Sequence, residues 1–138
     1  MADAEVPWGI YPRYQPCPPH RDFGCWFRWQ CWGVQTTHTT AELEGLPAGF
    51  DGFTIAHLSD LHGHEYGENS GELVERVRRE KPDLIVLTGD LIDRKSQLEM
   101  VPPLARRLAA IAPTYYVTGN HEWALGSATV KELKALLK

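Results

Sequence analysis

Three short apolar runs constrain the fold of this chain more than any other feature of its sequence. They are FTIAHLS at 53–59, DLIVLTG at 83–89 and TYYVTGN at 114–120, and they recur about every 30 residues, the length of one strand–helix–strand unit. Helical patterns lie between them, SGELVERVRREK at 70–81 and QLEMVPPLARRLAAIA at 97–112. Alternation of this kind predicts an α/β fold with a mostly parallel sheet.

Two further elements complete the predicted order β-β-α-β-α-β-α. VQTTHTTAEL at 34–43 alternates β-branched residues and predicts a strand, and SATVKELKALLK at 127–138 predicts an amphipathic helix. Ser70 stands where a residue would cap the first helix, and Pro82 where that helix must end. We expect the second helix to be disturbed near Pro102 and Pro103, because proline opposes the helix interior.

Residues 1–32 differ in kind from the domain that we expect at 33–138. They hold five of the ten prolines and four of the five tryptophans, which predicts an irregular arm. The arm either packs its rings on the domain, is disordered, or contacts a membrane surface. The three cysteines are Cys17, Cys25 and Cys31, whose number and spacing favour free thiols over a redox or metal role with His20.

Composition excludes several classes of function. The net charge of −4 and the isoelectric point near 5.8 argue against a nucleic-acid scaffold as the partner. No apolar run reaches the length of about 18 residues that a membrane span needs. The first residues lack the pattern of a signal peptide, so we expect a cytoplasmic location, with membrane association through the arm as the alternative.

Polar side chains follow the three apolar runs at equal intervals. The first polar residue after or at the end of each run is Asp60, Asp90 or Asn120. His62 follows Asp60, Asp93 and Arg94 follow Asp90, and His121 follows Asn120. Because the carboxyl ends of parallel strands share one edge of a sheet, we expect these side chains to meet there. Gly89 and Gly119 precede two of them, where the backbone must turn sharply.

Carboxylate, amide and imidazole groups together favour a divalent metal site for Mn, Fe, Zn or Mg. No cysteine belongs to the set, which disfavours a closed structural zinc site. A carboxylate can bridge two ions, and two ions roughly 3.5–4 Å apart can stabilise both oxygens of a phosphoryl displacement. The pattern is therefore compatible with a site for one or two divalent ions.

Simpler interpretations stand beside these roles. Asp60 and Asp90 could cap turns, Asn120 could be a left-handed turn residue, and His121 could lie free on the surface. For Asp93 and Arg94 the favoured interpretation is a local ion pair. His57 is predicted to be a packed or hydrogen-bonded strand residue, His64 and Glu65 to be loop residues, and Glu122 has no predicted role.

The motifs SDLHG, GDLIDR and GNHE resemble those of the calcineurin-like metallophosphoesterases, and LPAGFDGFTIAHLSDLH and KPDLIVLTGDLID resemble their YkuE-like bacterial branch. The likeness covers about residues 33–138. It implies that Asp60 and His62 bind one metal ion, that Asp90 bridges two ions, and that Asn120 binds the second. It also implies that His121 is a general acid or transition-state stabiliser and that Arg94 faces the substrate phosphate. The implied reaction is hydrolysis of a phosphate mono- or diester by metal-bound hydroxide.

The same resemblance implies a four-layer α/β/β/α sandwich, of which this chain would be the N-terminal βαβαβα half. In that family a second half adds more histidine ligands, whereas this sequence has no histidine after His121. We therefore expect a truncated chain, a poorly held second ion, weak or absent activity, and self-association through an uncovered sheet. The alternative is a non-catalytic remnant that binds a metal or a partner. Neither a phosphate-binding GxxxxGK[ST] loop nor a GxSxG elbow is present.

Overall fold

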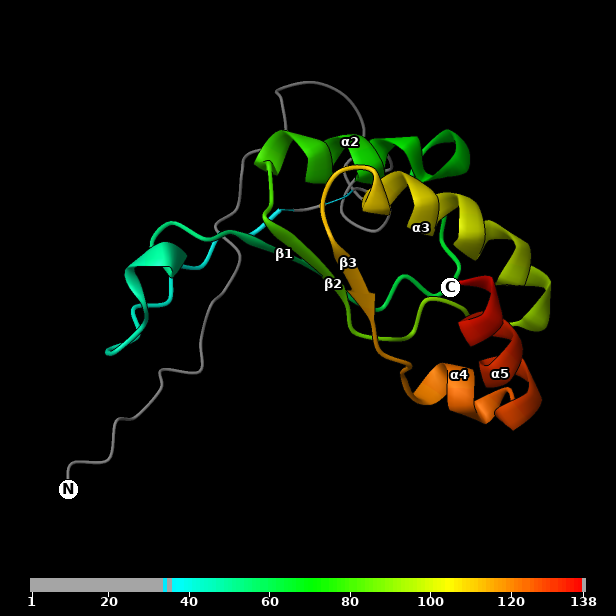
Figure 1. Cartoon of the computed structure of the whole chain (residues 1–138). Helices are drawn as coiled ribbons and strands as arrows, with labels where there is room; N and C mark the ends of the chain where they lie inside the picture. Colours follow the sequence, from blue (N-terminus) through cyan, green and yellow to red (C-terminus); the bar gives the residue numbers. More distant parts are fainter. Residues whose placement is uncertain (1–33, 35, 138) are drawn as a thin grey trace, which may run out of the picture. The chain divides into compact units, whose positions relative to one another are not determined.

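The computed structural model describes residues 34 and 36–137 of the 138-residue chain. The chain divides into two compact units, Met1–Thr40 and Ala41–Lys138, and the second contains every helix and strand of the described residues (Figure 1). The Pro/Trp-rich arm at 1–32, its cysteines and its predicted membrane contact lie outside the described residues. None of the described helices is long and apolar enough to cross a bilayer.

Three parallel strands form the sheet, as the sequence predicts. They are β1 (Ile55–Leu58), β2 (Leu84–Leu87) and β3 (Thr114–Tyr116), in the spatial order β1-β2-β3. Ile55 pairs with Leu84 and Ile85 pairs with Thr114. Each strand is shorter than its apolar run, because the polar residues at the end of the run leave the sheet and enter a turn. The α/β class and the parallel direction are confirmed.

The described residues also form four α-helices and three short 3-10 helices. The α-helices are α2 (Gly71–Glu80), α3 (Val101–Ala109), α4 (Asn120–Ala124) and α5 (Ser127–Leu136), and the 3-10 helices are η1 (Ala48–Phe50), η2 (Glu68–Ser70) and η3 (Lys95–Met100). Ser70 occupies the position before α2, but its side chain makes no capping hydrogen bond. Pro102 and Pro103 lie in the first turn of α3, where a missing N–H costs nothing, so they begin the helix instead of disturbing its interior.

The strand predicted at 34–43 is wrong. Its described residues, 34 and 36–43, form no regular element, and all residues from 36 to 43 are exposed. Alternating β-branched residues stabilise a strand by packing on a half-buried pleated surface. This segment packs on no such surface among the described residues, so its β-branched residues do not stabilise a strand.

The hydrophobic core lies on one face of the sheet. Leu58, Ile85 and Leu87 point to this face and are at most 7% exposed. Helices α2 and α3 lie side by side against it (Figure 1), and α3 contributes the buried Leu104 and Leu108. Because this face is buried, the orientation of each strand is fixed, and with it the direction of the side chains at the strand's end.

The opposite face of the sheet is open. Ile55, Tyr115 and Val117 lie on it and are 54%, 66% and 65% exposed, while Leu84 and Val86 of β2 are half-buried. An uninterrupted apolar run such as 83–89 is typical of a strand that is buried on both faces, but only one face of β2 is buried here. An apolar sheet face without a cover is present among the described residues, and self-association through it stays a prediction.

Candidate functional site

The turns after β1 and β2 run together at the carboxyl edge of the sheet. The backbone N–H of Asp60 donates to the carbonyl of Gly89 at 3.3 Å, and that of His62 donates to the carbonyl of Asp90 at 2.8 Å. Asp60, His62 and Asp90 all have positive φ, between 50° and 56°. Such a backbone is costly for residues other than glycine, and it often marks functional sites. The turns are thus held in a strained form that aims these side chains away from the sheet.

The turns after β2 and β3 approach each other even more closely. Gly89 has φ +95°, and a Cβ added to it would lie 2.5 Å from the Cα of Gly119. A Cβ added to Gly119 would collide with the carboxylate of Asp90. Only glycine fits at both positions without a shift of the neighbouring turn.

Three of the four predicted metal ligands gather at this edge. Asp60, His62 and Asp90 each offer one ligand atom, and these atoms lie within 4.8 Å of one another. Nε2 of His62 is 3.7 Å from Oδ1 of Asp60. The side chain of Asp60 is 64% exposed, and its Oδ2 accepts a hydrogen bond from the hydroxyl of Ser59. Two carboxylates and one imidazole suit a divalent cation of hard to borderline character, so the donor set fits the predicted metal.

Asn120 lies beside this group at the start of α4. It is exposed and has no positive φ, so the interpretation as a left-handed turn residue is wrong. The next backbone N–H, that of His121, donates to Oδ1 of Asp90 at 2.9 Å. The chain at Asn120 therefore adjoins Asp90, and the role of its amide as a ligand stays a prediction.

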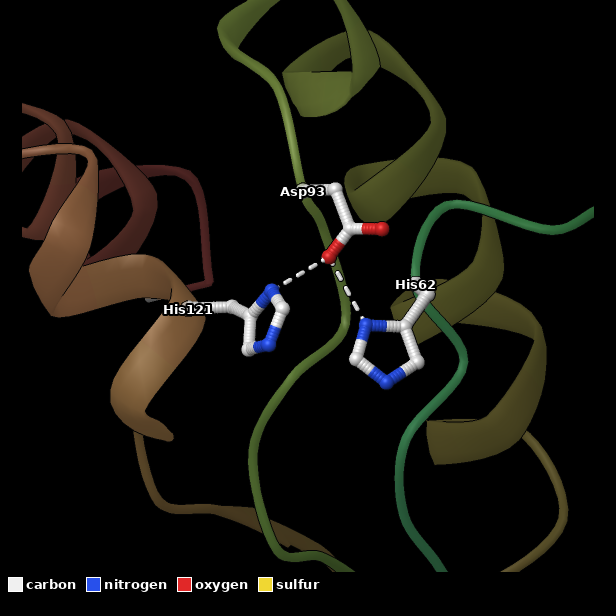
Figure 2. A group of neighbouring side chains, drawn as sticks. All are labelled: His62, Asp93 and His121. Atoms are coloured by element: carbon white, nitrogen blue, oxygen red, sulfur yellow. Dashed lines mark hydrogen bonds and ion pairs between the residues drawn. The ribbon is translucent and has the colours of Figure 1, made fainter.

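A second group forms around Asp93. One oxygen of this carboxylate accepts hydrogen bonds from Nδ1 of His62 at 2.7 Å and from Nδ1 of His121 at 2.6 Å. Figure 2 shows that each imidazole turns one nitrogen toward Asp93 and the other away from it. The two rings meet edge to face, with centroids 4.6 Å apart. Asp93 thus pairs with the two histidines, and the favoured interpretation of a local ion pair with Arg94 is wrong.

Asp93 fixes the protonation pattern of both rings. An ionised carboxylate only accepts hydrogen bonds, so both Nδ1 atoms carry a proton. In the neutral rings Nε2 is then free to bind a cation or to accept a proton. The hydrogen bond to Asp93 raises the pKa of His62, and the same bond lowers the pKa of Asp93. A carboxylate behind a histidine is the usual support of a metal-binding imidazole.

Glu122 and Gln97 support the site, and sequence reasoning gave neither of them a role. Oε1 of Gln97 accepts from the backbone N–H of Asp93 at 2.8 Å and of Arg94 at 2.9 Å. Glu122 is fully buried and accepts hydrogen bonds from the turns after β2 and β3. Glu122 stands three residues after the turn glycine Gly119, a spacing typical of a glutamate that caps a helix start. That spacing is the signal that could have found it.

The remaining predicted residues lie around these groups. Arg94 is exposed, and its role toward a phosphate stays a prediction. Nε2 of His57 lies 2.6 Å from Oγ1 of Thr88, which confirms a hydrogen-bonded strand residue. The ring of His64 meets that of Tyr66 edge to face in the loop that follows the turn after β1, as expected of a loop residue.

Comparison with models of known protein families identifies the family of this chain. Residues 53–136 match the family model described as calcineurin-like phosphoesterase, and they make up more than half of the chain. The chain belongs to the calcineurin-like phosphoesterase family. The family resemblance of the three motifs is confirmed.

Similar members of the family come from bacteria. The chain is 37% identical over 106 residues to the "Uncharacterized metallophosphoesterase YkuE" of Bacillus subtilis, covering 72% of this chain and 37% of that protein. It is 34% identical over 100 residues to YkoQ of the same organism, covering 70% of this chain and 37% of that protein. An uncharacterized metallophosphoesterase of Aquifex aeolicus is 40% identical over 92 residues, covering 63% of this chain and 34% of that protein. The match therefore spans well under half the length of these relatives.

Proposed function

We propose that this chain provides the metal-binding edge of a phosphoesterase that hydrolyses a phosphate mono- or diester. The observation that carries the proposal is the cluster of ligand atoms from Asp60, His62 and Asp90 within 4.8 Å, at the ends of two neighbouring parallel strands. Membership of the calcineurin-like phosphoesterase family supports the reaction class.

Each ligand has a distinct task in this proposal. Asp60 and Nε2 of His62 would hold one ion, and Asp90 and Asn120 would hold a second one. Divalent ions at such a site act as Lewis acids and lower the pKa of bound water to near neutrality. Mn, Fe, Zn and Mg all suit these oxygen and nitrogen donors.

His121 and Arg94 act on the substrate in the same proposal. Asp93 holds Nδ1 of His121, so the ring presents Nε2 away from Asp93 (Figure 2). A proton carried on Nε2 would pass to the leaving oxygen as its bond to phosphorus breaks, while water forms the new bond to phosphorus and releases its extra proton to the solvent. The guanidinium of Arg94 offers a paired donor to the phosphate oxygens.

A second candidate function is a chain that binds one ion, or a partner, without hydrolysis. The number of donors favours this second function. Asp60, His62 and Asp90 form a compact set for one ion, whereas only Asp90 and Asn120 remain for a second ion. Catalytic metal ions usually keep three protein ligands. This candidate predicts one tightly bound ion and no turnover.

The test compares Asp90→Asn with Asp51→Asn, the same change at an exposed turn residue that belongs to neither group of candidate ligands. Mn²⁺ binding is measured by calorimetry and hydrolysis with an aryl phosphate. We expect Asp90→Asn to weaken Mn²⁺ binding at least tenfold and to abolish any hydrolysis, while Asp51→Asn matches the wild-type chain. Equal binding and turnover in Asp90→Asn would refute the proposed site. One ion without turnover in the wild-type chain would favour the second candidate.

A further inference from the structure

Glu122 is a charged side chain with no exposed surface, and the ligand set that we assign to the metal does not use it. Burying a carboxylate costs several kcal/mol unless hydrogen bonds compensate its charge. Here four backbone N–H groups do so, those of Asp90 at 3.0 Å, Leu91 at 2.6 Å, Ile92 at 3.3 Å and Gly119 at 2.8 Å. All four donors belong to the turns that build the site.

The two oxygens of Glu122 divide these donors between two turns. Oε1 accepts from Leu91 and Ile92, which follow β2, and Oε2 accepts from both Asp90 and Gly119, which belong to different turns. The turns already approach too closely for a side chain at Gly119. One buried carboxylate therefore ties the end of β2 to the end of β3.

Asp90 is held from both sides by this arrangement. Its backbone N–H, at a strained φ of 53°, donates to Glu122, and Oδ1 of its side chain accepts from the backbone N–H of His121. Glu122 and His121 are neighbours in the first turn of α4. The helix thus fixes both the turn that carries Asp90 and the direction of its carboxylate.

The chemistry of this position calls for a carboxylate in particular. Both oxygens must accept hydrogen bonds, because each faces two N–H groups. A glutamine would keep one acceptor but turn an NH₂ group toward two donors, leaving buried polar groups unpaired. An apolar side chain would leave all four N–H groups unpaired.

We propose that Glu122 is a positioning residue, which holds Asp90 in its metal-binding geometry without touching the ion. The inference rests on the proposed function, in which Asp90 is a metal ligand. A merely structural Glu122 would affect the stability of the fold and leave the metal affinity of folded molecules unchanged. A positioning Glu122 affects that affinity directly, as residues behind metal ligands commonly do by 10- to 100-fold.

The test compares Glu122→Gln with Glu132→Gln, the same change at an exposed position of α5. Mn²⁺ is titrated by calorimetry at a temperature where circular dichroism shows each variant to be folded. We expect Glu122→Gln to weaken Mn²⁺ binding at least tenfold and Glu132→Gln to stay within twofold of wild type. A folded Glu122→Gln with wild-type affinity would overturn the inference. A wild-type chain that binds no Mn²⁺ would instead refute the proposed function.

A second measurement needs no variant and applies even if Glu122→Gln fails to fold. Amide hydrogen exchange is followed by NMR on the metal-free wild-type chain, before and after addition of Mg²⁺. We expect the four N–H groups that Glu122 accepts to be protected already without metal, although they lie in turns. Fast exchange at these amides before Mg²⁺ is added, followed by protection afterwards, would show that the metal orders Asp90 and that Glu122 does not.

Discussion

At the scale of single residues, Asp93 links the metal ligands to the reaction chemistry. It holds His62, which we assign to the metal, and His121, which we assign to the leaving group, through one carboxylate oxygen. The sequence could name the two histidines, because each follows a predicted strand end. It could not name their shared partner, because nothing local to Asp93 shows that residues 31 positions before it and 28 after it would reach the same oxygen.

Removing the charge of Asp93 tests this link. In Asp93→Asn the bond to Nδ1 of His62 loses its ionic character, so the imidazole becomes a weaker and less well oriented ligand. We expect Mn²⁺ affinity to fall by about 10- to 100-fold. Calorimetry measures it, with Asp51→Asn as the matched control. Wild-type affinity in Asp93→Asn would show that the pair does not support the metal.

The pH dependence of metal binding follows from the raised pKa of His62. Its main cause is the hydrogen bond to Asp93, and a proton on the ring must leave before Nε2 can bind a cation. As pH falls, Mn²⁺ affinity should therefore begin to weaken above pH 6.5, the ordinary value for histidine. In Asp93→Asn the same weakening should move to lower pH. Mn²⁺ titrations across pH 5–8 measure the affinity of the wild-type chain and of Asp93→Asn. If the two proteins lose affinity over the same pH range, the explanation is contradicted.

At the scale of elements, apolar periodicity predicted the three parallel strands and the helices between them. Each of these three strands has a partner in the sheet, and α2 and α3 cover the core face (Figure 1), so local pattern and tertiary packing agree. The segment at 34–43 alternates β-branched residues, but its described residues from 36 to 43 are exposed and form no strand. Helix α4 was not predicted, because a helix of five residues is too short to show helical periodicity. It begins directly after the turn glycine Gly119.

The close approach of the strand ends makes Gly119 a sensitive position. In Gly119→Ala the new Cβ collides with the carboxylate of Asp90, so either the turn or the ligand must move. We expect a loss of about 1–3 kcal/mol in the free energy of unfolding together with weaker Mn²⁺ binding. Urea denaturation and calorimetry measure the two effects.

The control for this change is Gly49→Ala in η1, where an added Cβ meets nothing within 4 Å and φ is not positive. It should leave both quantities within error of the wild-type values. If Gly119→Ala behaves like Gly49→Ala, the turns are looser than the structure describes.

At the scale of the whole molecule, the exposed sheet face is the most unusual feature of the described residues. Ile55, Tyr115 and Val117 present apolar surface beside the half-buried side chains of β2. Single exposed apolar residues are ordinary, but a continuous apolar sheet face favours association. The relatives that match this chain are far longer than the matched region, and the chain spans 34–37% of their lengths.

A charge on this face tests whether the isolated chain associates through it. We expect the wild-type chain to form oligomers as its concentration rises, and Val117→Lys to shift it toward monomer. Because Val117 is 65% exposed, the free energy of unfolding should change by less than about 0.5 kcal/mol. Sedimentation velocity measures the association, with Leu136→Lys on α5 as the control. A wild-type chain that stays monomeric at every concentration would contradict the prediction.

In the proposed site, the ends of β1 and β2 hold a divalent cation through Asp60, His62 and Asp90. Anomalous diffraction from crystals soaked in MnCl₂ locates such an ion itself. We expect a peak within bonding distance, about 2.0–2.4 Å, of Nε2 of His62 and of an oxygen from each aspartate. A peak between Asp93 and the two histidines, or no peak at this edge of the sheet, would contradict the proposed site.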